Sequence, residues 1–330
     1  MDRLTHIAFS AMNTDVEAQL EYDECSSALA ERDAGILQGW FRDCEETFSR
    51  FRANSELSMF NSSQGKLVLL SDRLFELLSL SEHYRAATNG LFQICILPEL
   101  LAAGYDRSFE LIVGKAGSGD KAVAPGKASA RSGLELHPSM EAGRLIGETG
   151  IDLGGIAKSW TVLQAGEWLK GKSYLKAALV NAGGDAFYWR REGHDGKVAF
   201  AISSPWDGKD DIGMLKLHGG AVATSSVLGR RWSKSNAVRH HLIDPRTGES
   251  SSSGIVQATV AGSDPVACEI WAKIICIAGK EGLALMEEQA PGYEALFVWE
   301  DGTAQLLGSK HEERMEWQLC TATNNVGEER

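Results

Sequence analysis

The stretch Gly150-Ile-Asp-Leu-Gly-Gly-Ile-Ala-Lys158 sets a carboxylate, a glycine pair and a lysine within a few residues, directly before an amphipathic run. Glycines have no Cβ, so the backbone can approach a phosphate closely, and the N–H groups at a helix start favour negative charge. A lysine at the end of the motif can reach the same anion. A diglycine before a helix also serves tight packing, so this stretch alone leaves phosphate binding and packing both open.

The regions around this stretch predict a mixture of helices and strands. Apolar residues at helical spacing predict one helix ending near residue 49 and another after Ser71, while a third over 160–169 leads into a strand. No steady alternation of strand, helix and strand is present, so we expect an α+β fold with mixed or antiparallel sheets and flanking helices. The strands predicted from alternation and apolar runs are 176–181, 198–202, 212–218, 255–261 and 293–299, with one helix between the last two.

Composition narrows the classes of function. The chain has 330 residues, 43% of them hydrophobic and 24% charged, which is ordinary for a globular protein. A net charge of −12 argues against a nucleic-acid partner, and no apolar run is long enough for membrane insertion. The N-terminus lacks a signal-peptide pattern, and the six cysteines lack disulfide spacing, so we expect reduced thiols and a cytoplasmic location.

The chain is long enough for one large domain. We expect a single catalytic domain over residues 1–330, with a two-lobed arrangement as the alternative. Residues from about 114 to 133 are rich in glycine, alanine, serine and lysine and show no period, which predicts a flexible insertion or surface loop.

Three polar segments are candidates for chemistry. Asn181-Ala-Gly-Gly-Asp185 and Ala223-Thr-Ser-Ser226 are more typical of tight turns than of ligand sites when each is taken alone. Arg239-His-His-Leu-Ile-Asp-Pro-Arg-Thr-Gly248 contains a predicted turn after the only paired histidines in the chain. Histidine transfers protons readily near neutral pH, so this segment holds either a general base or a structural imidazole.

The predicted helix over 267–279 carries Glu269 and Lys273, spaced four residues apart with the acid first. One interpretation is a solvated ion pair, which on a helix surface contributes only about 0.2–0.5 kcal/mol. The other is that Glu269 supplies a hard oxygen ligand to a divalent cation such as Mg²⁺.

Taken in order, these segments resemble the ApbE family of FAD:protein FMN transferases over about residues 7 to 300. The agreement of many motifs in one order is more specific than any single motif. The segments are Ala11-Met-Asn-Thr14, Phe48-Ser-Arg-Phe51, Ser55 to Asn61, Gly90-Leu-Phe92, Pro98, Gly104 to Phe109, Ile151 to Lys158, Asn181 to Asp185, Ala223 to Ser226, His241 to Gly248, and the Glu269 helix.

The resemblance implies transfer of the FMN half of FAD to a threonine or serine hydroxyl of an acceptor flavoprotein, with release of AMP. It implies that His241 is the catalytic base. It also implies a Mg²⁺ site that takes a backbone carbonyl from Gly155 and a carboxylate from Glu269. Lys273 stands at the third ligand position of that site. The implied FAD contacts are Met12, Phe51, Ala103, Gly104, Tyr105, Asp152, Lys158 and Ile243.

The metal helix departs most from the family pattern. Glu269 stands where the family has Asp, and Lys273 stands where it has a metal-binding Thr. A lysine there either weakens the Mg²⁺ site or replaces part of its charge. Two other functions remain open at this level: a metal-dependent FAD pyrophosphatase that yields FMN and AMP, and a non-catalytic FAD-binding protein.

Overall fold

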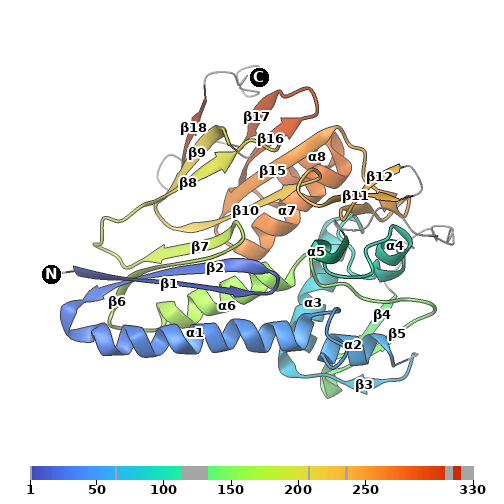
Figure 1. Cartoon of the computed structure of the whole chain (residues 1–330), viewed down its shortest axis with the longest axis horizontal. Coiled ribbons are helices and arrows are strands. Elements are labelled where there is room, and N and C mark those ends of the chain that lie inside the picture. The colour runs from blue at the N-terminus through green and yellow to red at the C-terminus, as the bar shows by residue number, and fades with distance from the viewer. Residues whose placement is uncertain are drawn as a thin grey trace.

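The computed structural model describes residues 2–63, 65–112, 133–206, 209–234, 237–308 and 315–320. Apart from Gly133, the predicted insertion at 114–133 lies outside these residues. Within the described ranges the structure is built around one eight-stranded sheet, in the order β1-β2-β6-β7-β10-β15-β16-β17 (Figure 1). Every neighbouring pair in this sheet is antiparallel, which confirms the predicted fold class.

The strands of the main sheet come from both ends of the chain. Tight connections join β1 to β2 and β6 to β7, whereas β2 pairs with β6 across a long sequence interval. The bounds are β1 (Asp2–Ala11), β2 (Thr14–Asp23), β6 (Leu175–Ala182), β7 (Asp185–Arg190), β10 (Gly220–Ser226), β15 (Ile255–Gly262), β16 (Glu294–Trp299) and β17 (Ala304–Leu307).

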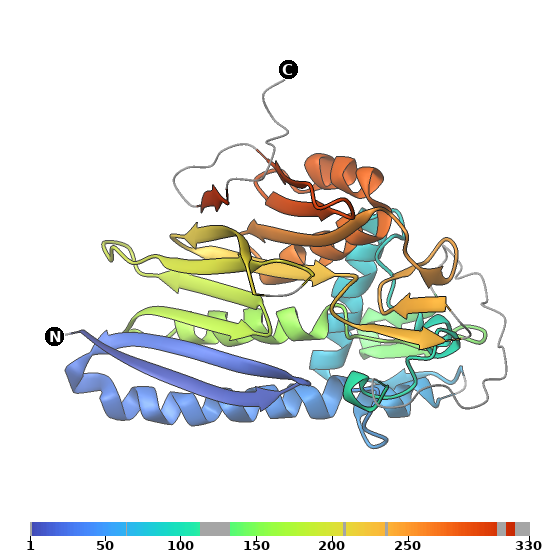
Figure 2. The same ribbon diagram turned by 45° about the horizontal axis from the view of Figure 1, so that its top comes forward.

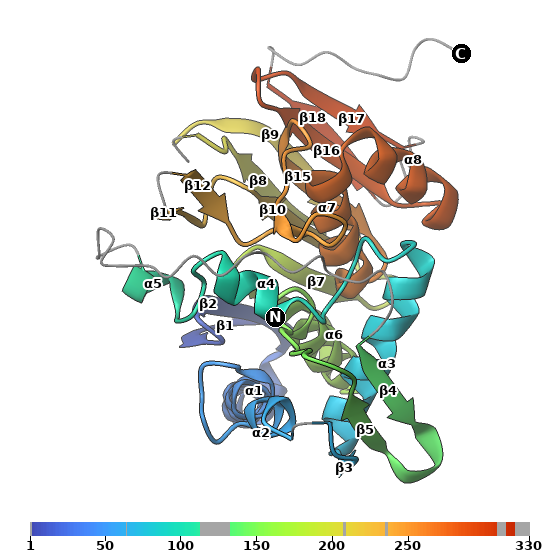
Figure 3. The same cartoon turned by 90° about the vertical axis from the view of Figure 1, so that its right-hand side faces the viewer.

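Three long helices cover one face of this sheet, α1 (Ser27–Phe48), α6 (Ala157–Lys170) and α7 (Pro265–Ala278). Figure 3 shows them in a row: α1 packs on β1 and β2, α6 on β6 and β7, and α7 on β10 and β15. Asp264 caps α7 by accepting from the N–H of Val266, 2.7 Å away, and Pro265 follows at the first helical position.

The interval between β15 and β16 holds two helices, so the prediction of one was incomplete. Gly279 ends α7 with a φ of 59° and starts α8 (Lys280–Gln289). That left-handed backbone is open to glycine at little cost, which explains the break in an otherwise continuous helical pattern.

Smaller elements surround the main sheet. One group, which includes α3 and the β3-β5-β4 sheet, lies at one end of it (Figure 2). The remaining helices are α2 (Glu56–Asn61), α3 (Asp72–Ala87), α4 (Leu97–Ala102) and α5 (Phe109–Ile112). The remaining strands are β3 (Val68–Leu69), β4 (Leu134–His137), β5 (Ala142–Leu145), β8 (Val198–Ser203), β9 (Asp211–Leu217), β11 (Arg231–Lys234), β12 (Ala237–His240), β13 (Ile243–Asp244), β14 (Glu249–Ser250) and β18 (Met315–Leu319).

The structure corrects one predicted turn and adds one hairpin. Residues 223–226 belong to strand β10, where the Thr224 hydroxyl lies 2.9 Å from that of Thr259 on β15. The segment is therefore held by cross-strand pairing, and its small polar residues do not mark a turn. The N-terminal hairpin of β1 and β2 was not predicted. None of the helices in the described ranges combines the length and apolar character needed to cross a bilayer.

Helix α6 approaches the sheet very closely at Gly166. A Cβ added at this position would lie 2.2 Å from Cδ1 of the buried Phe187 ring on β7. Because buried rings in a packed core cannot move far without strain, only glycine fits this contact.

We therefore expect Gly166→Ala to destabilise the protein by about 1–3 kcal/mol, the usual cost of overpacking a core. The measurement is the free energy of unfolding in denaturant. The matched control is Gly35→Ala in α1, where an added Cβ would meet nothing within 4 Å. This control should gain roughly 0.4–1 kcal/mol. An equal response of the two variants would contradict the packing argument.

Candidate active site

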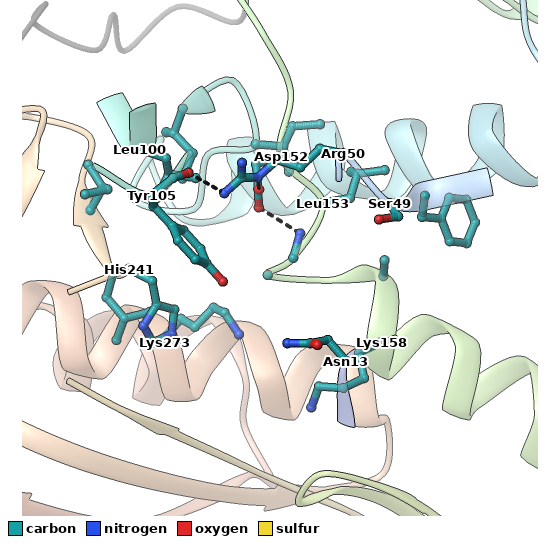
Figure 4. A pocket seen from close by; sticks show the side chains of 18 of the residues that line it. Asn13, Ser49, Arg50, Leu100, Tyr105, Asp152, Leu153, Lys158, His241 and Lys273 are labelled. Carbon is teal, nitrogen blue, oxygen red and sulfur yellow. Dashed lines mark hydrogen bonds and ion pairs between the residues drawn. The ribbon is translucent and has the colours of Figure 1, made fainter. Parts of the chain in front are cut away.

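A cavity of about 280 Å³ opens where the β1–β2 turn, the end of α1, the 150–156 loop, the start of α6 and helix α7 meet. Figure 4 shows Arg50 and Asp152 on one side of it and Lys273 and His241 on the other. Nine of the residues implied by the sequence line this cavity: Met12, Phe51, Tyr105, Asp152, Gly155, Lys158, His241, Ile243 and Lys273.

The glycine loop is fixed to the rest of the cavity through Asp152. One oxygen of this carboxylate accepts from the N–H of Gly154, 2.8 Å away, and the other pairs with the guanidinium of Arg50. Arg50 also donates to the carbonyl oxygen of Tyr105 at 2.8 Å. Both members of the ion pair are largely buried, so removing either one would leave a buried charge without its partner.

Aromatic side chains continue from Arg50 along the same side. The guanidinium carbon lies 4.1 Å from the ring centre of Phe51 and 4.7 Å from that of Tyr105, which are cation–π distances. Tyr105 in turn stacks on Trp232, with ring centres 5.3 Å apart. The indole N–H donates to the carbonyl of Ala103 at 2.7 Å. Ala103 and Gly104 therefore lie behind Tyr105 and are not among the residues lining the cavity.

The β1–β2 turn reaches the cavity in a strained conformation. Met12 and Asn13 have φ values of 52° and 60°, which a two-residue hairpin turn needs and which glycine or asparagine adopts most easily. Two acidic side chains secure the turn: Glu45 accepts from the N–H of Met12 at 3.1 Å, and Glu110 accepts from the Asn13 amide at 2.8 Å. A left-handed methionine at a ligand-sized cavity is typical of strain kept at a functional site.

The paired histidines occupy different environments. His241 lines the cavity, and burial holds its pKa well below the usual value, with the positive charges of Arg230 and Lys273 acting in the same direction. Its Nδ1 has no hydrogen-bond partner among the described residues. His240 points elsewhere: its Nε2 lies 3.0 Å from the carbonyl oxygen of Ser251, and burial lowers its pKa to about 4.

Two buried ion pairs lie beneath the cavity. Lys158 pairs with Asp185 at the start of β7 and donates to the carbonyl of Ala182 at the end of β6 at 3.0 Å. On α7, Nζ of Lys273 lies 2.7 Å from Oε1 of Glu269. The exposed fractions of Asp185 and Glu269 are only 1% and 3%, so the interpretation of Glu269 and Lys273 as a solvated pair is wrong.

The two acids respond differently to burial. Burial raises the pKa of Asp185 to about 6, and the negative charge of Glu269 adds to that shift, while Lys158 opposes it. Burial also acts to raise the pKa of Glu269, but Lys273 and Lys158 outweigh it and lower the pKa to about 2. Glu269 is therefore held as a carboxylate by the ammonium group beside it.

The residues that the resemblance implies for Mg²⁺ fit a divalent cation poorly. Glu269 has one oxygen bound to Lys273, and its other oxygen has no hydrogen-bond partner in the described part of the chain. The Lys273 side chain lies directly over Gly155, with Cε 3.2 Å from the point where a Cβ would be. The described ranges contain no group of three or more His, Cys, Asp or Glu side chains suited to a metal. Mg²⁺ binding stays a prediction, and the position of Lys273 over Gly155 and against Glu269 argues against it.

Three functional candidates escaped the sequence analysis. Arg50 lies within the Phe48 to Phe51 motif, and its place in that motif is a signal that could have marked it as a site residue. Asp185 belongs to a turn that was named, but its pairing with Lys158 depends on how α6 meets the sheet. Arg230 also lines the cavity and makes no ion pair or side-chain hydrogen bond with the described residues. Its neighbourhood in the sequence carries no pattern that would have predicted this.

Comparison with known proteins agrees with this architecture. The model of the ApbE family matches residues 12–297, from the β1–β2 turn into β16. The chain belongs to the ApbE family. The matched region contains every residue that lines the cavity.

Two curated relatives are similar to the chain, and both are FAD:protein FMN transferases. The one from Klebsiella pneumoniae (strain 342) is 27% identical over 149 residues, which are 45% of this chain and 45% of that protein. The match therefore spans less than half the length of that relative. The one from Treponema pallidum (strain Nichols) is 23% identical over 285 residues, covering 78% of this chain and 74% of the relative.

Solved ApbE structures share the fold. The ApbE protein of Thermotoga maritima has a TM-score of 0.78 at 19% identity, covering 94% of this chain and 98% of its own. The flavin transferase ApbE of Vibrio cholerae has a TM-score of 0.72 at 17% identity, covering 97% and 98%.

The buried His240, which lies outside the cavity, predicts a pH dependence of stability. The pKa of His240 is about 4 in the folded protein against an ordinary 6.5, so only the unfolded state takes up this proton as the pH falls from 6.5 to 4. His240 should therefore contribute a loss of roughly 3 kcal/mol of stability over that window, whereas Asp185, whose pKa is raised to about 6, acts in the opposite direction.

Denaturant unfolding at several pH values checks this. His240→Gln should lose less stability than the wild type between pH 7 and pH 4. His6→Gln, at an exposed site on β1, should follow the wild type. If the unfolding free energy of His240→Gln changed with pH as steeply as that of the wild type, the lowered pKa assigned to His240 would be contradicted.

Proposed function

We propose that this protein transfers the FMN moiety of FAD to a threonine or serine hydroxyl of an acceptor flavoprotein and releases AMP. The observation that carries the proposal is a cavity, inside the matched ApbE region, that joins basic side chains, a glycine loop and a buried imidazole. The two curated relatives are named for this activity, which supports the same conclusion.

The reaction exchanges one phosphorus–oxygen bond for another. The acceptor hydroxyl oxygen forms a bond to the phosphorus of the FMN half, the pyrophosphate bond breaks, and AMP leaves. The hydroxyl proton moves to His241 during the attack. A base must be unprotonated before it acts, and burial together with Arg230 and Lys273 lowers the pKa of His241 in that direction.

Positive side chains line the part of the cavity where a diphosphate would lie. Lys158 of α6, Lys273 of α7 and Arg230 of the loop before β11 line the cavity together with Gly154 and Gly155. Placed around developing negative charge, such groups stabilise a phosphoryl-transfer transition state. The proposal includes no step through a metal ion, because Gly155, Glu269 and Lys273 do not form a suitable ligand set.

The remaining residues of the cavity concern the binding of FAD. We assign Phe51, Tyr105, Met12 and Ile243 to contacts with FAD, because their apolar surfaces border the cavity. Asp152 contributes by holding Arg50 and the glycine loop in place. Cavity residues run from 12 to 277, which supports treating the chain as one catalytic domain.

The first expectation is that FAD binds more tightly than FMN or AMP alone. The cations and the glycine loop surround a site for a diphosphate joined to two nucleotide halves, and each single nucleotide makes only part of these contacts. Calorimetric titration with the three ligands measures this. Equal affinity for FMN and FAD would contradict the proposal that the Gly150 to Lys158 stretch binds the diphosphate.

The second expectation concerns the base. His241→Ala should keep FAD binding and slow transfer about 10²–10⁴-fold, as expected for loss of a general base. His240→Ala is the matched control, because its side chain bonds the Ser251 carbonyl and does not line the cavity. It should transfer FMN nearly as fast as the wild type.

The assay incubates the protein with FAD and an acceptor flavoprotein domain that carries a modifiable threonine, and mass spectrometry follows the acceptor. A mass gain of one FMN is the expected result. Free FMN and AMP without acceptor modification would indicate a pyrophosphatase instead. Equal losses in the two histidine variants would withdraw the assignment of His241.

A further inference from the structure

We propose that the ammonium group of Lys273 is the resident cation of this site and takes the place of a divalent metal, so that FAD binds without Mg²⁺. The inference rests on the proposed function for the identity of the ligand. It concerns the side of the cavity formed by α7, where Lys273 projects toward the glycine loop (Figure 4).

The first support is the space that Lys273 occupies. Its Cε lies 3.2 Å and its Cδ 3.6 Å from the position of a Cβ at Gly155, so the aliphatic stem crosses directly over this glycine. A cation bound between the Gly155 backbone and the Glu269 carboxylate would have to share that space. The Lys273 side chain already fills this space and places its ammonium group where the cation would lie.

The second support is how firmly the ammonium is held. The Lys273 and Glu269 side chains are 13% and 4% exposed, and the 2.7 Å contact joins them within one helical turn. With Lys158 committed to Asp185, two ammonium groups already balance the two buried acids, and Mg²⁺ would face their repulsion.

The third support is the charge that remains for a ligand. Each of the two lysine–carboxylate pairs is neutral overall, so neither supplies excess positive charge. Arg230 lines the same cavity and has no ion-pair partner among the described residues. A diphosphate therefore meets the hydrogen-bond donors of Lys273 and the guanidinium of Arg230, which forms no direct ion pair with the described residues, without a metal bridge.

Equilibrium binding of FAD, measured by calorimetry with EDTA or with added Mg²⁺, tests the inference without using activity. The wild type should bind FAD equally well in both conditions, and Mg²⁺ alone should give no binding heat and no rise in melting temperature. Lys273→Thr should gain all three responses: Mg²⁺ binding, a higher melting temperature with Mg²⁺, and FAD affinity that rises about tenfold or more when Mg²⁺ is added.

Two further variants keep the test interpretable if Lys273→Thr folds poorly with Glu269 unpaired. The double variant Glu269→Gln with Lys273→Met removes both charges together. It should bind FAD about tenfold or more weakly than the wild type and gain nothing from Mg²⁺. Lys170→Thr is the matched control, because Lys170 pairs with Glu167 on the exposed side of α6, and it should bind FAD as the wild type does.

The outcomes separate this inference from the proposed function. FAD binding by the wild type that requires Mg²⁺ would overturn the inference and leave FMN transfer intact. A Lys273→Thr variant that folds and still ignores Mg²⁺, or a double variant with wild-type FAD affinity, would overturn it as well. Absence of FAD binding in every condition would instead contradict the proposed function.

Discussion

Two ion pairs beneath the cavity, Lys158 with Asp185 and Glu269 with Lys273, constrain much of the surrounding structure. Both acids are almost fully buried, and a charge in such a place is tolerated only with its partner present. The first pair ties the start of α6 to the start of β7, and the second lies within α7. The first pair therefore holds α6 in place on the sheet, since a shift would leave an unpaired charge in apolar surroundings, and the second neutralises a buried acid inside α7.

The same constraint explains the character of the cavity. Most of its basic groups are already engaged: Arg50 by Asp152, Lys158 by Asp185 and Lys273 by Glu269. Groups held in this way need little reorganisation when an anionic ligand enters, which is the condition for effective electrostatic stabilisation. Their charges are also compensated locally. That is why Arg230, without such a partner in the described ranges, has a distinct place in the site.

Local patterns predicted much of the fold but only part of the site. Apolar residues recur at helical spacing in α1, α3 and α6 because one face of each helix is buried. This spacing can be recognised in the local sequence alone. The missed hairpin had a signal, because Val16, Ala18, Leu20 and Tyr22 alternate along β2. The sequence carries no signal for the burial of Glu269 and Lys273, because a four-residue spacing of acid and base is the same on an exposed helix. These residues are buried because the order of strands in the sheet places α7 over β10 and β15. Arg230 reaches the cavity for the same nonlocal reason.

The order of strands in the main sheet also governs when the site can form during synthesis. Val16 in β2 has its partner at Ala182 in β6, so the N-terminal hairpin leaves the ribosome long before the strand that fixes it in the sheet. The cavity needs still later residues, up to Ile277 in α7. Because contacts this distant in sequence close large loops, their formation is slow. A nascent chain that stops before α7 has its glycine loop but lacks Lys273 and Ile277, so the cavity is complete only after α7 has been made.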